Sequence, residues 1–438
     1  MRIRLLTAAG QFLTSRRGNV AVISAFALLV MMIAAGVGVD YTMAARRQDQ
    51  INGIADAAAL SAVTSTMMQQ SAATAQTRAQ NVFLSQIVTV SGVTYSPSNV
   101  TVTATDATNG TKITRTAVVT YTASSANFFA GLLGISNSTI HGSSTAVSGQ
   151  APKTDFFLLL DTSPSMEIAA TTTGINTMVA NTSSQGGCAF GCHESYPAAD
   201  SLGNPNGEDN YALSRALGVT LRLDLVNSAT QNLMTTAATT ATQNNTTYRA
   251  AIYTMDYSVN QLIGITSNLT AAKNAAANIQ PLEVYDNNCL TSSNCNQDED
   301  SYLDNGLSTL NSAMPNPGQG TNNSGDTPQE VLMIVSDGVV DEAISGARSM
   351  APINTLASWC STIKARNIRI AFLYLTYNPL PTNTFYNQNI APFQSQIATD
   401  AQNCASSGLY FEVDTDGDIS AAMAQLFQKA VQSARLTQ

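Results

Sequence analysis

Histidine and charged side chains are both scarce in this sequence. Two His residues occur among 438 positions, and charged residues make up 11% of the chain. So few imidazoles leave little room for His-based acid–base catalysis or zinc chemistry. The formal net charge is −9, and no cluster of Lys and Arg interrupts the bulk of the chain. Nucleic acid is therefore not an expected partner, because a phosphate backbone needs a basic surface to bind.

One long apolar run is present near the N-terminus. Residues 1–17 are basic, and the 22 positions of residues 18–39 carry no charge. As a helix this run would be about 33 Å long, enough to cross a bilayer core. The arginines before it predict a cytoplasmic N-terminus. The run is longer than the apolar region of most cleaved signal peptides, so we expect a retained transmembrane helix, with a signal peptide as the alternative.

The next segment, residues 40–150, changes from helical to strand patterning. From Tyr41 to about Gln80 there is no Pro, and Ala, Gln, Met and Leu are frequent. This composition predicts that the helix continues beyond the membrane. Apolar and polar residues then alternate at 98–105 and 114–123, which predicts two strands of a small sheet joined by the Asn109-Gly110 turn.

A membrane helix followed by an Ala-rich helix and a small sheet resembles the pilin-like module of Tad (tight-adherence) pilus-assembly proteins. RRGNVAV at 16–22 and DAAALSA at 56–62 are similar to the N-terminal module of TadG-like members. Pseudopilins that a prepilin peptidase processes carry a Glu five positions beyond the cleaved Gly, and Ile23 stands there in this chain. The resemblance therefore also implies a retained anchor. Any bitopic protein with an Ala-rich stalk is the alternative.

The second half of the chain contains two apolar runs of strand length that each end in Asp. They are FFLLLD at 156–161 and VLMIVSD at 331–337. Such runs predict central strands of a parallel sheet that is covered on both faces. Strand and helix patterns alternate over residues 154–434, with a strand hairpin at 248–265. This order predicts an α/β fold with a doubly wound, mostly parallel sheet. Residues 148–153 are the expected linker.

Polar residues follow both apolar runs. Asp161, Ser163 and Ser165 follow the first run, and Asp337 ends the second. In open parallel sheets, working polar groups lie just past the carboxyl ends of the strands. Two carboxylates and two hydroxyls form an all-oxygen set that suits a hard cation such as Mg²⁺.

These residues also carry a family resemblance. DTSPS at 161–165 matches the D-x-S-x-S signature of the metal-ion-dependent adhesion site in von Willebrand factor type A domains, and SDG at 336–338 is similar to that family's later Asp-Gly motif. The resemblance implies that Ser163 and Ser165 bind Mg²⁺ directly, with Mn²⁺ or Ca²⁺ as alternatives, and that the carboxylates act largely through water. It also implies an open metal position that an acidic side chain of a partner protein fills.

The third motif of that family is usually a Thr six residues ahead of a helix Leu. Counting back from Leu307 gives Ser301, which can supply the same hydroxyl. Asp300, the residue before it, is an alternative ligand that would neutralise the cation and weaken the capture of an acidic partner. Asp298 and Glu299 are expected to be solvated.

Two other kinds of acidic site, a calcium loop and a phosphatase site, match this sequence less well. The run at 414–418 has calcium-loop spacing, but Ile419 stands where that loop needs Gly, so we expect a turn in which Asp418 caps the last helix. A phosphatase site built on D-x-D would need a second carboxylate where Ser163 stands. No nucleophile–base pair is evident at His141 or His193, so no enzyme is expected.

Two insertions distinguish the chain from the family pattern, at residues 167–211 and 284–300. Both leave from the sheet edge that carries the candidate site, and we expect them to surround or cap it. All six Cys lie in the C-terminal part of the chain: Cys188, Cys192, Cys289, Cys295, Cys360 and Cys404. An even count after an export-type segment favours disulfides, most simply 188 with 192, 289 with 295 and 360 with 404. A zinc site from Cys188, Cys192 and His193 with Cys289 or Cys295 is the alternative, although its spacings miss the usual C-x2-C.

Together these features predict a single-pass protein of the inner membrane. Its parts would be a cytoplasmic segment at 1–17, a transmembrane helix at 18–39, a pilin-like module at 40–150 and a type A-like domain at 154–434, with the last two in the periplasm or at the cell surface. We expect a Tad-type pilus-assembly or adhesion protein that binds other pilus-assembly or surface proteins through its cation. The alternative is a scaffold of a membrane complex that works without metal.

Overall fold

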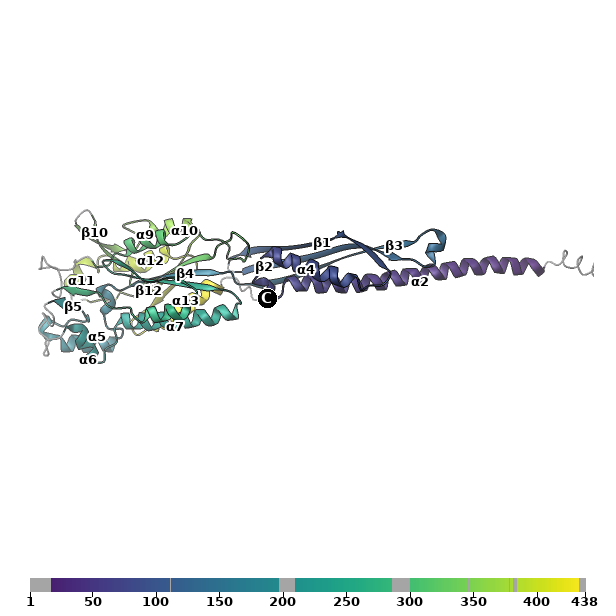
Figure 1. The fold of residues 1–438 in the computed structure, drawn as a ribbon. Coiled ribbons are helices and arrows are strands. Elements are labelled where there is room, and N and C mark those ends of the chain that lie inside the picture. The colour runs from purple at the N-terminus through teal and green to yellow at the C-terminus, as the bar shows by residue number, and fades with distance from the viewer. Residues whose placement is uncertain are drawn as a thin grey trace, which may run out of the picture. The chain divides into compact units, whose positions relative to one another are not determined.

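The computed structural model describes residues 17–110, 112–196, 209–285, 300–344, 347–377, 379–380 and 384–432. The chain divides into two compact units, which are treated separately below (Figure 1). Unit 1 comprises residues 1–107 and 114–149, and unit 2 comprises residues 108–113 and 150–438.

Unit 1 begins with a long helix, α2, which runs Arg17–Ala62. Its part from Val22 onward is long and apolar enough to cross a membrane. The expected continuation to about Gln80 is wrong, because the chain turns after Ala62 into α3 (Ser65–Met68) and α4 (Ala72–Ile87). Thr64 and Ser71 start these helices by accepting hydrogen bonds from the N–H groups of Met67 and Thr74. Hydroxyl caps of this kind favour a new helix start over continuation.

A buried arginine holds this turn in place. Arg115 is 1% exposed and pairs with Asp106, with Nε 2.7 Å from Oδ1. Its other guanidinium nitrogens donate to the carbonyls of Met67 and Gln70 at 2.5 and 2.9 Å. Two carbonyl groups at the helix break are thereby satisfied.

The sheet of unit 1 has the order β1-β2-β3. β1 runs Val93–Asn109 and β2 runs Lys112–Ala126, and they contain the two expected strands. β3 (Asn137–Gln150) was not expected, because its residues are mostly small and polar and its apolar positions are few. Small alanines of α2 and α4 pack together with the valines of β1 and β2, so the helices lie close to the sheet.

Unit 2 is built on a six-stranded sheet with the order β13-β12-β9-β4-β6-β7. The strands are β4 (Thr154–Asp161), β6 (Tyr248–Met255), β7 (Val259–Thr266), β9 (Gln329–Ser336), β12 (Arg369–Leu375) and β13 (Tyr410–Val413). All neighbouring pairs are parallel except β6 and β7, which form the expected hairpin. The first strand of unit 2, β4, lies inside this sheet, and later strands add on both sides of it. This is the order of a doubly wound sheet.

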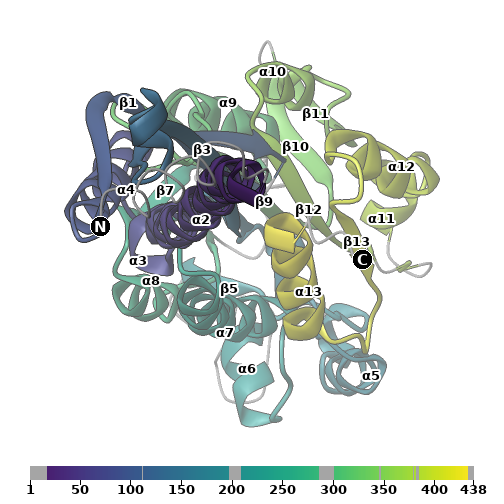
Figure 2. The same cartoon turned by 90° about the vertical axis from the view of Figure 1, so that its right-hand side faces the viewer.

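Helices cover both faces of the sheet (Figure 2). The helices α7 (Arg222–Gln243), α8 (Leu269–Ala276) and α13 (Ile419–Gln432) pack on one face. On the other face lie α9 (Leu303–Ala313), α10 (Trp359–Ala365) and α12 (Gln394–Cys404). Leu158 of β4 points into the first core and Leu159 into the second. Burial of both faces explains the uninterrupted apolar run of β4. The predicted fold class is confirmed.

Several short elements were not expected, and most lie in or near the insertions. They are α5 (Thr172–Asn181), β5 (His193–Tyr196), α6 (Asn210–Ala216), β8 (Glu283–Tyr285), α11 (Thr384–Asn389) and the hairpin of β10 (Val339–Ile344) with β11 (Ala347–Pro352). The described residues also contain three 3-10 turns: η1 (Ala130–Leu133), η2 (Pro164–Glu167) and η3 (Ser183–Gln185). Most are too short and too polar for periodicity to indicate them.

Candidate metal centre

The turn after β4 brings two hydroxyls together. Asp161 ends the strand fully buried, and its Oδ1 accepts a 3.0 Å hydrogen bond from the backbone N–H of Ser163. An Asp that bonds the N–H two residues on fixes a tight turn. Pro164 then opens the 3-10 turn η2. As a result the hydroxyl oxygens of Ser163 and Ser165 lie 3.1 Å apart.

The end of β9 meets this turn. Ser336 donates from its hydroxyl to Oδ2 of Asp161 at 2.6 Å, and its oxygen accepts the N–H of Gly338 at 2.9 Å. Gly338 has a φ of +74°, which favours glycine. Asp337 is fully buried, and the Ser165 hydroxyl lowers the pKa of its carboxyl. The four residues Asp161, Ser163, Ser165 and Asp337 are therefore brought together, although the sequence separates the two carboxylates widely.

One oxygen of this cluster has no partner. Oδ1 of Asp337 accepts the N–H of Val339 at 3.2 Å, but its Oδ2 is buried and has no hydrogen-bond partner among the residues that the structure describes. A buried carboxylate oxygen without a partner is costly. Asp161 and Ser163 are at most 1% exposed, whereas Ser165 is half-buried and lies on the outer side of the cluster.

The two carboxylates oppose each other electrostatically. Burial, together with the charge of Asp337, raises the pKa of Asp161 to about 7, although hydrogen bonds from Ser163 and Ser336 counteract it. Burial also raises the pKa of Asp337, while the Ser165 hydroxyl and the Arg222 charge lower it. A pair of buried acids in this state is stabilised by a nearby positive charge.

A divalent cation fits this donor set. Two hydroxyls and two carboxylates offer only oxygen atoms, which Mg²⁺, Mn²⁺ and Ca²⁺ prefer. The unpartnered Oδ2 of Asp337 is the observation that favours a cation here. Within the described ranges, no group of three His, Cys, Asp or Glu side chains is placed to hold a metal, so the hydroxyls of Ser163 and Ser165 are essential to this candidate.

Ser301, the predicted third ligand, lies beside the strand that follows Asp337. Its hydroxyl donates to the carbonyl of Val339 at 2.8 Å, and its backbone pairs with Asp341 of β10. A hydroxyl that donates to a carbonyl keeps its oxygen lone pairs for accepting. Its role as a ligand stays a prediction. Asp300 precedes it in the described part of the chain, whereas Asp298 and Glu299 lie outside the described residues.

Two residues near the centre were not expected from the sequence. Ser336 was part of the quoted motif but had no assigned role. Arg222, at the start of α7, is 4% exposed, and its charge acts on Asp337. One guanidinium nitrogen donates to the carbonyl of Thr376 at 2.5 Å, and Nη1 is buried without a hydrogen-bond partner in the described part of the chain. The position of Arg222 near Asp337 could not be predicted from the sequence, since an Arg at a helix start usually faces solvent.

The two insertions are joined beside the 161–167 turn. β5 of the first insertion pairs in parallel with β8, where the second insertion begins. The N–H of Leu282, just before β8, donates to the carbonyl of Thr162 at 3.3 Å. The N–H of His193 in β5 donates to the buried carboxylate of Glu167 at 3.1 Å. The described parts of both insertions therefore pack against the turn that carries the two serines.

The acidic run at 414–418 is a turn in which Asp418 caps α13, as expected. Its Oδ1 accepts the N–H of Ala421 at 2.9 Å. Asp416 has a φ of +68° and accepts hydrogen bonds from Thr172, which fixes the start of α5. The carboxylates of Asp416 and Asp418 thus bond protein groups.

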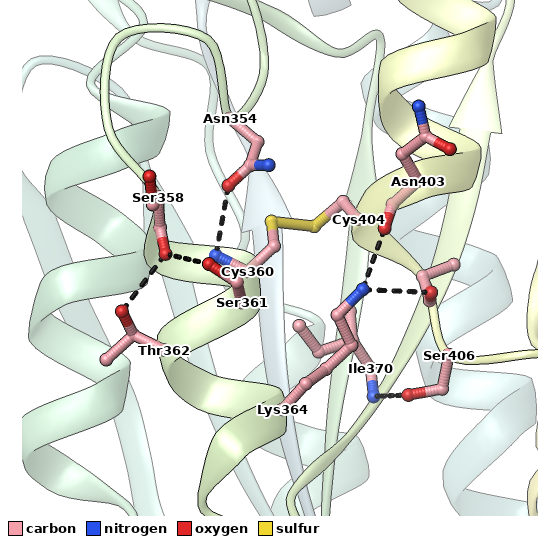
Figure 3. Close-up of a disulfide and its surroundings, with 11 residues drawn as sticks. Asn354, Ser358, Cys360, Ser361, Thr362, Lys364, Ile370, Asn403, Cys404 and Ser406 are labelled. Carbon is pink, nitrogen blue, oxygen red and sulfur yellow. Dashed lines mark hydrogen bonds between the residues drawn. A yellow bond between two sulfur atoms is a disulfide. The ribbon is translucent and has the colours of Figure 1, made fainter.

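One predicted disulfide is present in unit 2. Cys360 in α10 and Cys404 in α12 are bonded, and both are fully buried (Figure 3). Lys364 reinforces the junction by donating to the carbonyl of Asn403 at 2.7 Å. Cys188 and Cys192 are half-buried in the first insertion, and Cys289 and Cys295 lie outside the described residues, so the pairings of these four stay predictions. For the zinc alternative, the described part of the chain contains no group of three His, Cys, Asp or Glu side chains that could hold a metal ion.

With the geometry established, comparison with known families gives one sequence match. Residues 18–65 match the family model described as "Putative Flp pilus-assembly TadE/G-like". The resemblance predicted from residues 16–22 and 56–62 is thereby confirmed for this segment. No curated protein matches the sequence.

Solved structures similar to this chain share little sequence with it. The vWF domain of the type V pili tip protein Mfa5 from Porphyromonas gingivalis is 11% identical with a TM-score of 0.36, and the alignment covers 65% of this chain and 98% of that one. BatB from Bacteroides thetaiotaomicron is 12% identical with a TM-score of 0.32, covering 64% and 99%. Proximal thread matrix protein 1 from the mussel byssus, with a zinc-occupied MIDAS motif, is 13% identical with a TM-score of 0.33, covering 64% and 46%.

The chain thus joins a TadE/G-like N-terminal segment to a doubly wound α/β domain.

Proposed function

We propose that this protein is a membrane-anchored pilus-assembly or adhesion protein of a Tad-type system. It binds protein partners through a divalent cation held at the carboxyl edge of the unit 2 sheet. Ser163 and Ser165 hold the cation directly, Asp161 and Asp337 hold it largely through water, and Ser301 completes the set. The protein catalyses no reaction.

The single observation that carries this proposal is the buried Oδ2 of Asp337, which lies in a cluster of oxygen ligands and has no hydrogen-bond partner within the described ranges. The bound cation supplies a positive charge that attracts an external carboxylate. Ser163 and Ser165 contribute no negative charge, so the cation keeps more of its own charge than it would among carboxylates alone. Ser165 is half-buried, which leaves this side of the cluster open to a partner. The partner therefore offers an Asp or Glu side chain.

The N-terminal apolar helix anchors the protein in the inner membrane, with residues 1–17 in the cytoplasm. Both units face the periplasm or the cell surface. Reporter enzymes that work only outside the cytoplasm should be active when fused after residue 150. Activity of a cytoplasm-dependent reporter at the same position would contradict this orientation.

The cation site is tested with the full chain in detergent. Calorimetry should detect one weak Mg²⁺ or Mn²⁺ site in the natural protein and none in Ser163→Ala. The matched control is Ser312→Ala, because Ser312 lies in α9, where its hydroxyl donates to the Ser308 carbonyl. The control should bind Mg²⁺ as the natural protein does.

Partner binding is tested separately, by recovery of bound proteins from native membranes with and without EDTA. Partners should be lost both with EDTA and with Ser163→Ala, and retained with Ser312→Ala. Recovery that is indifferent to EDTA and to Ser163→Ala would contradict a cation-dependent contact.

A second candidate function is a metal-independent scaffold of a membrane or pilus complex. The observation that favours it is Arg222, a buried positive charge that already acts on Asp337. In that case the positive charge of Arg222 balances part of the negative charge that a metal ion would otherwise balance. Partner binding that survives EDTA, Ser163→Ala and the loss of any calorimetric Mg²⁺ signal would favour the scaffold.

A further inference from the structure

The turn between β2 and β3 exposes a cluster of apolar side chains. This apolar turn, residues 127–136, contains no charged residue. Four of its side chains are more than half exposed: Phe128 at 77%, Leu132 at 77%, Leu133 at 55% and Ile135 at 57%. Scattered exposed apolar residues are normal, but a contiguous cluster of this kind marks an interaction surface.

The apolar turn is fixed to α2 (Figure 1). The two carboxylate oxygens of Asp40 accept the N–H groups of Phe128 and Ala130 at 2.9 and 2.6 Å. The ring of Phe129 lies so close to Gly36 that a Cβ at that glycine would collide with it. Gly36 and Asp40 are buried, whereas Val37 and Val39, which flank them on the helix surface, are exposed.

These contacts set the depth of the turn relative to the membrane helix. Asp40 closes the uncharged run of residues 18–39, and Gly36 lies inside that run. The two positions are about 6 Å apart along the helix axis. A helix that crosses a bilayer of about 30 Å of hydrocarbon uses nearly the whole of this run. The apolar turn therefore lies level with the last helical turn of the span.

The backbone of the apolar turn suits a water-poor environment. The N–H groups of Leu132, Gly134 and Ile135 donate to carbonyls within the turn at 3.0 to 3.1 Å. The N–H of Asn127 donates to the carbonyl of Ser136 at 2.9 Å, which closes the turn. Backbone groups satisfied in this way can approach hydrocarbon at low cost.

We propose that the apolar turn is a second membrane-contacting element, which inserts into the same bilayer interface that the end of α2 crosses. The bilayer is the occupant because the turn is continuous with the membrane span and level with its end, and because its exposed side chains are apolar and uncharged. Phe and Leu side chains enter the boundary between headgroups and acyl chains. Two contacts, helix and turn, fix the rotation of unit 1 about the helix axis.

This inference rests on the proposed membrane anchor and is independent of the cation site. Its test uses the full chain in liposomes of phosphatidylethanolamine and phosphatidylglycerol whose acyl chains carry bromine, which quenches Trp by contact. Trp359 is the chain's single Trp, so every protein carries Trp359→Phe. Leu132→Trp then reports on the turn. Leu133→Trp is a second reporter, in case the first variant does not fold.

Two further positions serve as references. Phe26→Trp lies within the apolar run, where Phe26 is 68% exposed, and reports whether the anchor is in the bilayer. Val147→Trp replaces a 59% exposed side chain in β3, ten positions beyond the start of that strand at Asn137. It lies about 30 Å along the strand from the turn. Trp at position 132 should be quenched severalfold more than Trp at position 147, and most by bromine close to the headgroups.

The possible outcomes separate the two proposals. Strong quenching at position 26 with equal, weak quenching at 132 and 147 overturns the inference and leaves the anchor intact. No quenching at position 26 overturns both. Protection of position 132 from an aqueous quencher without quenching by brominated lipid means that protein, such as a second copy of the chain, covers the turn, and this also overturns the inference.

Discussion

The hydroxyl of Ser336 donates a 2.6 Å hydrogen bond to the carboxylate of Asp161, a residue 175 positions earlier in the chain. The two residues end neighbouring parallel strands, β9 and β4, and both are fully buried. The bond joins the two halves of the candidate cation site. It also orients Asp161, whose other oxygen accepts the N–H of Ser163.

Ser336→Ala should weaken cation binding without removing a metal ligand. Loss of the hydroxyl leaves Oδ2 of Asp161 buried and unpartnered, which costs about 1–3 kcal/mol of folding stability. Groups that orient metal ligands typically contribute about 10- to 100-fold to metal affinity. We therefore expect Mg²⁺ affinity to fall by at least about tenfold in calorimetry. Ser312→Ala is the control, and an unchanged affinity in Ser336→Ala would contradict the orienting role.

Cation affinity should increase with pH. Burial and the charge of Asp337 raise the pKa of Asp161 to about 7, and a cation binds the ionised carboxylate. Below pH 7 one proton must leave for each ion that binds, so affinity should fall by up to about tenfold per pH unit. Calorimetry between about pH 5.5 and 8.5, in buffers of different ionisation enthalpy, measures both affinity and proton release. A pH-independent affinity would contradict this coupling.

Cation affinity should rise with pH, but the folding stability of the metal-free protein should fall. Folded Asp161 keeps its proton up to about pH 7, whereas the unfolded carboxyl loses it near its ordinary value of 3.8. Between these values the folded state binds more protons, so the metal-free protein loses stability as pH rises. Saturating Mg²⁺ should reduce this loss, which thermal unfolding at several pH values will measure.

Arg222→Met should strengthen cation binding. The Arg222 charge lowers the pKa of Asp337, so it shares the task of a metal in balancing the buried carboxylates. Removal of that charge makes the carboxylates attract a divalent ion more strongly, and the gain in Tm on addition of Mg²⁺ should exceed that of the natural protein. Arg215→Met is the control, since Arg215 is 39% exposed and pairs with Asp224. A smaller Tm gain in Arg222→Met would contradict the prediction.

Glu330→Gln should remove a pH-dependent loss of stability at the opposite edge of the sheet. Glu330 lies next to Asp155 across strands β9 and β4, and Asp155 is paired with Arg249. Burial, followed by the charge of Asp155, raises the pKa of Glu330 to about 9. The folded chain keeps this proton where the unfolded chain loses it, so folding stability falls as pH rises from about 4.5 to 9.

Gln resembles the protonated acid and does not titrate. The stability advantage of Glu330→Gln over the natural protein should therefore grow between about pH 5 and 9, as measured by denaturant unfolding. Glu412→Gln is the control, because Glu412 is exposed. Parallel pH profiles for Glu330→Gln and the natural protein would be the contrary result.

Replacement of both Cys360 and Cys404 by Ala should lower the free energy of unfolding. The bond closes a loop with a sequence separation of 44, and both residues are fully buried. The chain-entropy relation gives about 4 kcal/mol for a loop of this size. Denaturant unfolding of the oxidised natural protein and the double variant measures the difference. Equal midpoints would contradict a stabilising role.

The sheet of unit 2 was predictable because its strands are long, apolar and buried on both faces. β6 was expected at Tyr248–Met255 and has those bounds. The helix start at Thr64 was not predicted. The sequence is rich in Ala on both sides of Thr64, so it does not indicate that the Thr64 side chain caps a new helix. The same limitation applies to β3, whose small polar residues give no alternation strong enough to indicate a strand.

At the candidate site, the sequence predicted which oxygen donors meet but not what surrounds them. Asp161, Ser163, Ser165 and Asp337 share one sheet edge because parallel strands end together. The placement of Ser301 beside Val339 depends on β10, which was not expected. Arg222 could not be assigned because its approach to Asp337 depends on where α7 begins relative to the sheet.

The central position of β4 has a consequence for biogenesis. Phe156 in β4 pairs across to Val331 in β9, so one whole side of the strand has no partner until the ribosome has made the later segment. Sheets with such distant pairings form slowly. Meanwhile an apolar strand with an open edge is prone to join other chains. The growing polypeptide must therefore be shielded from its neighbours until residues 329–336 have emerged.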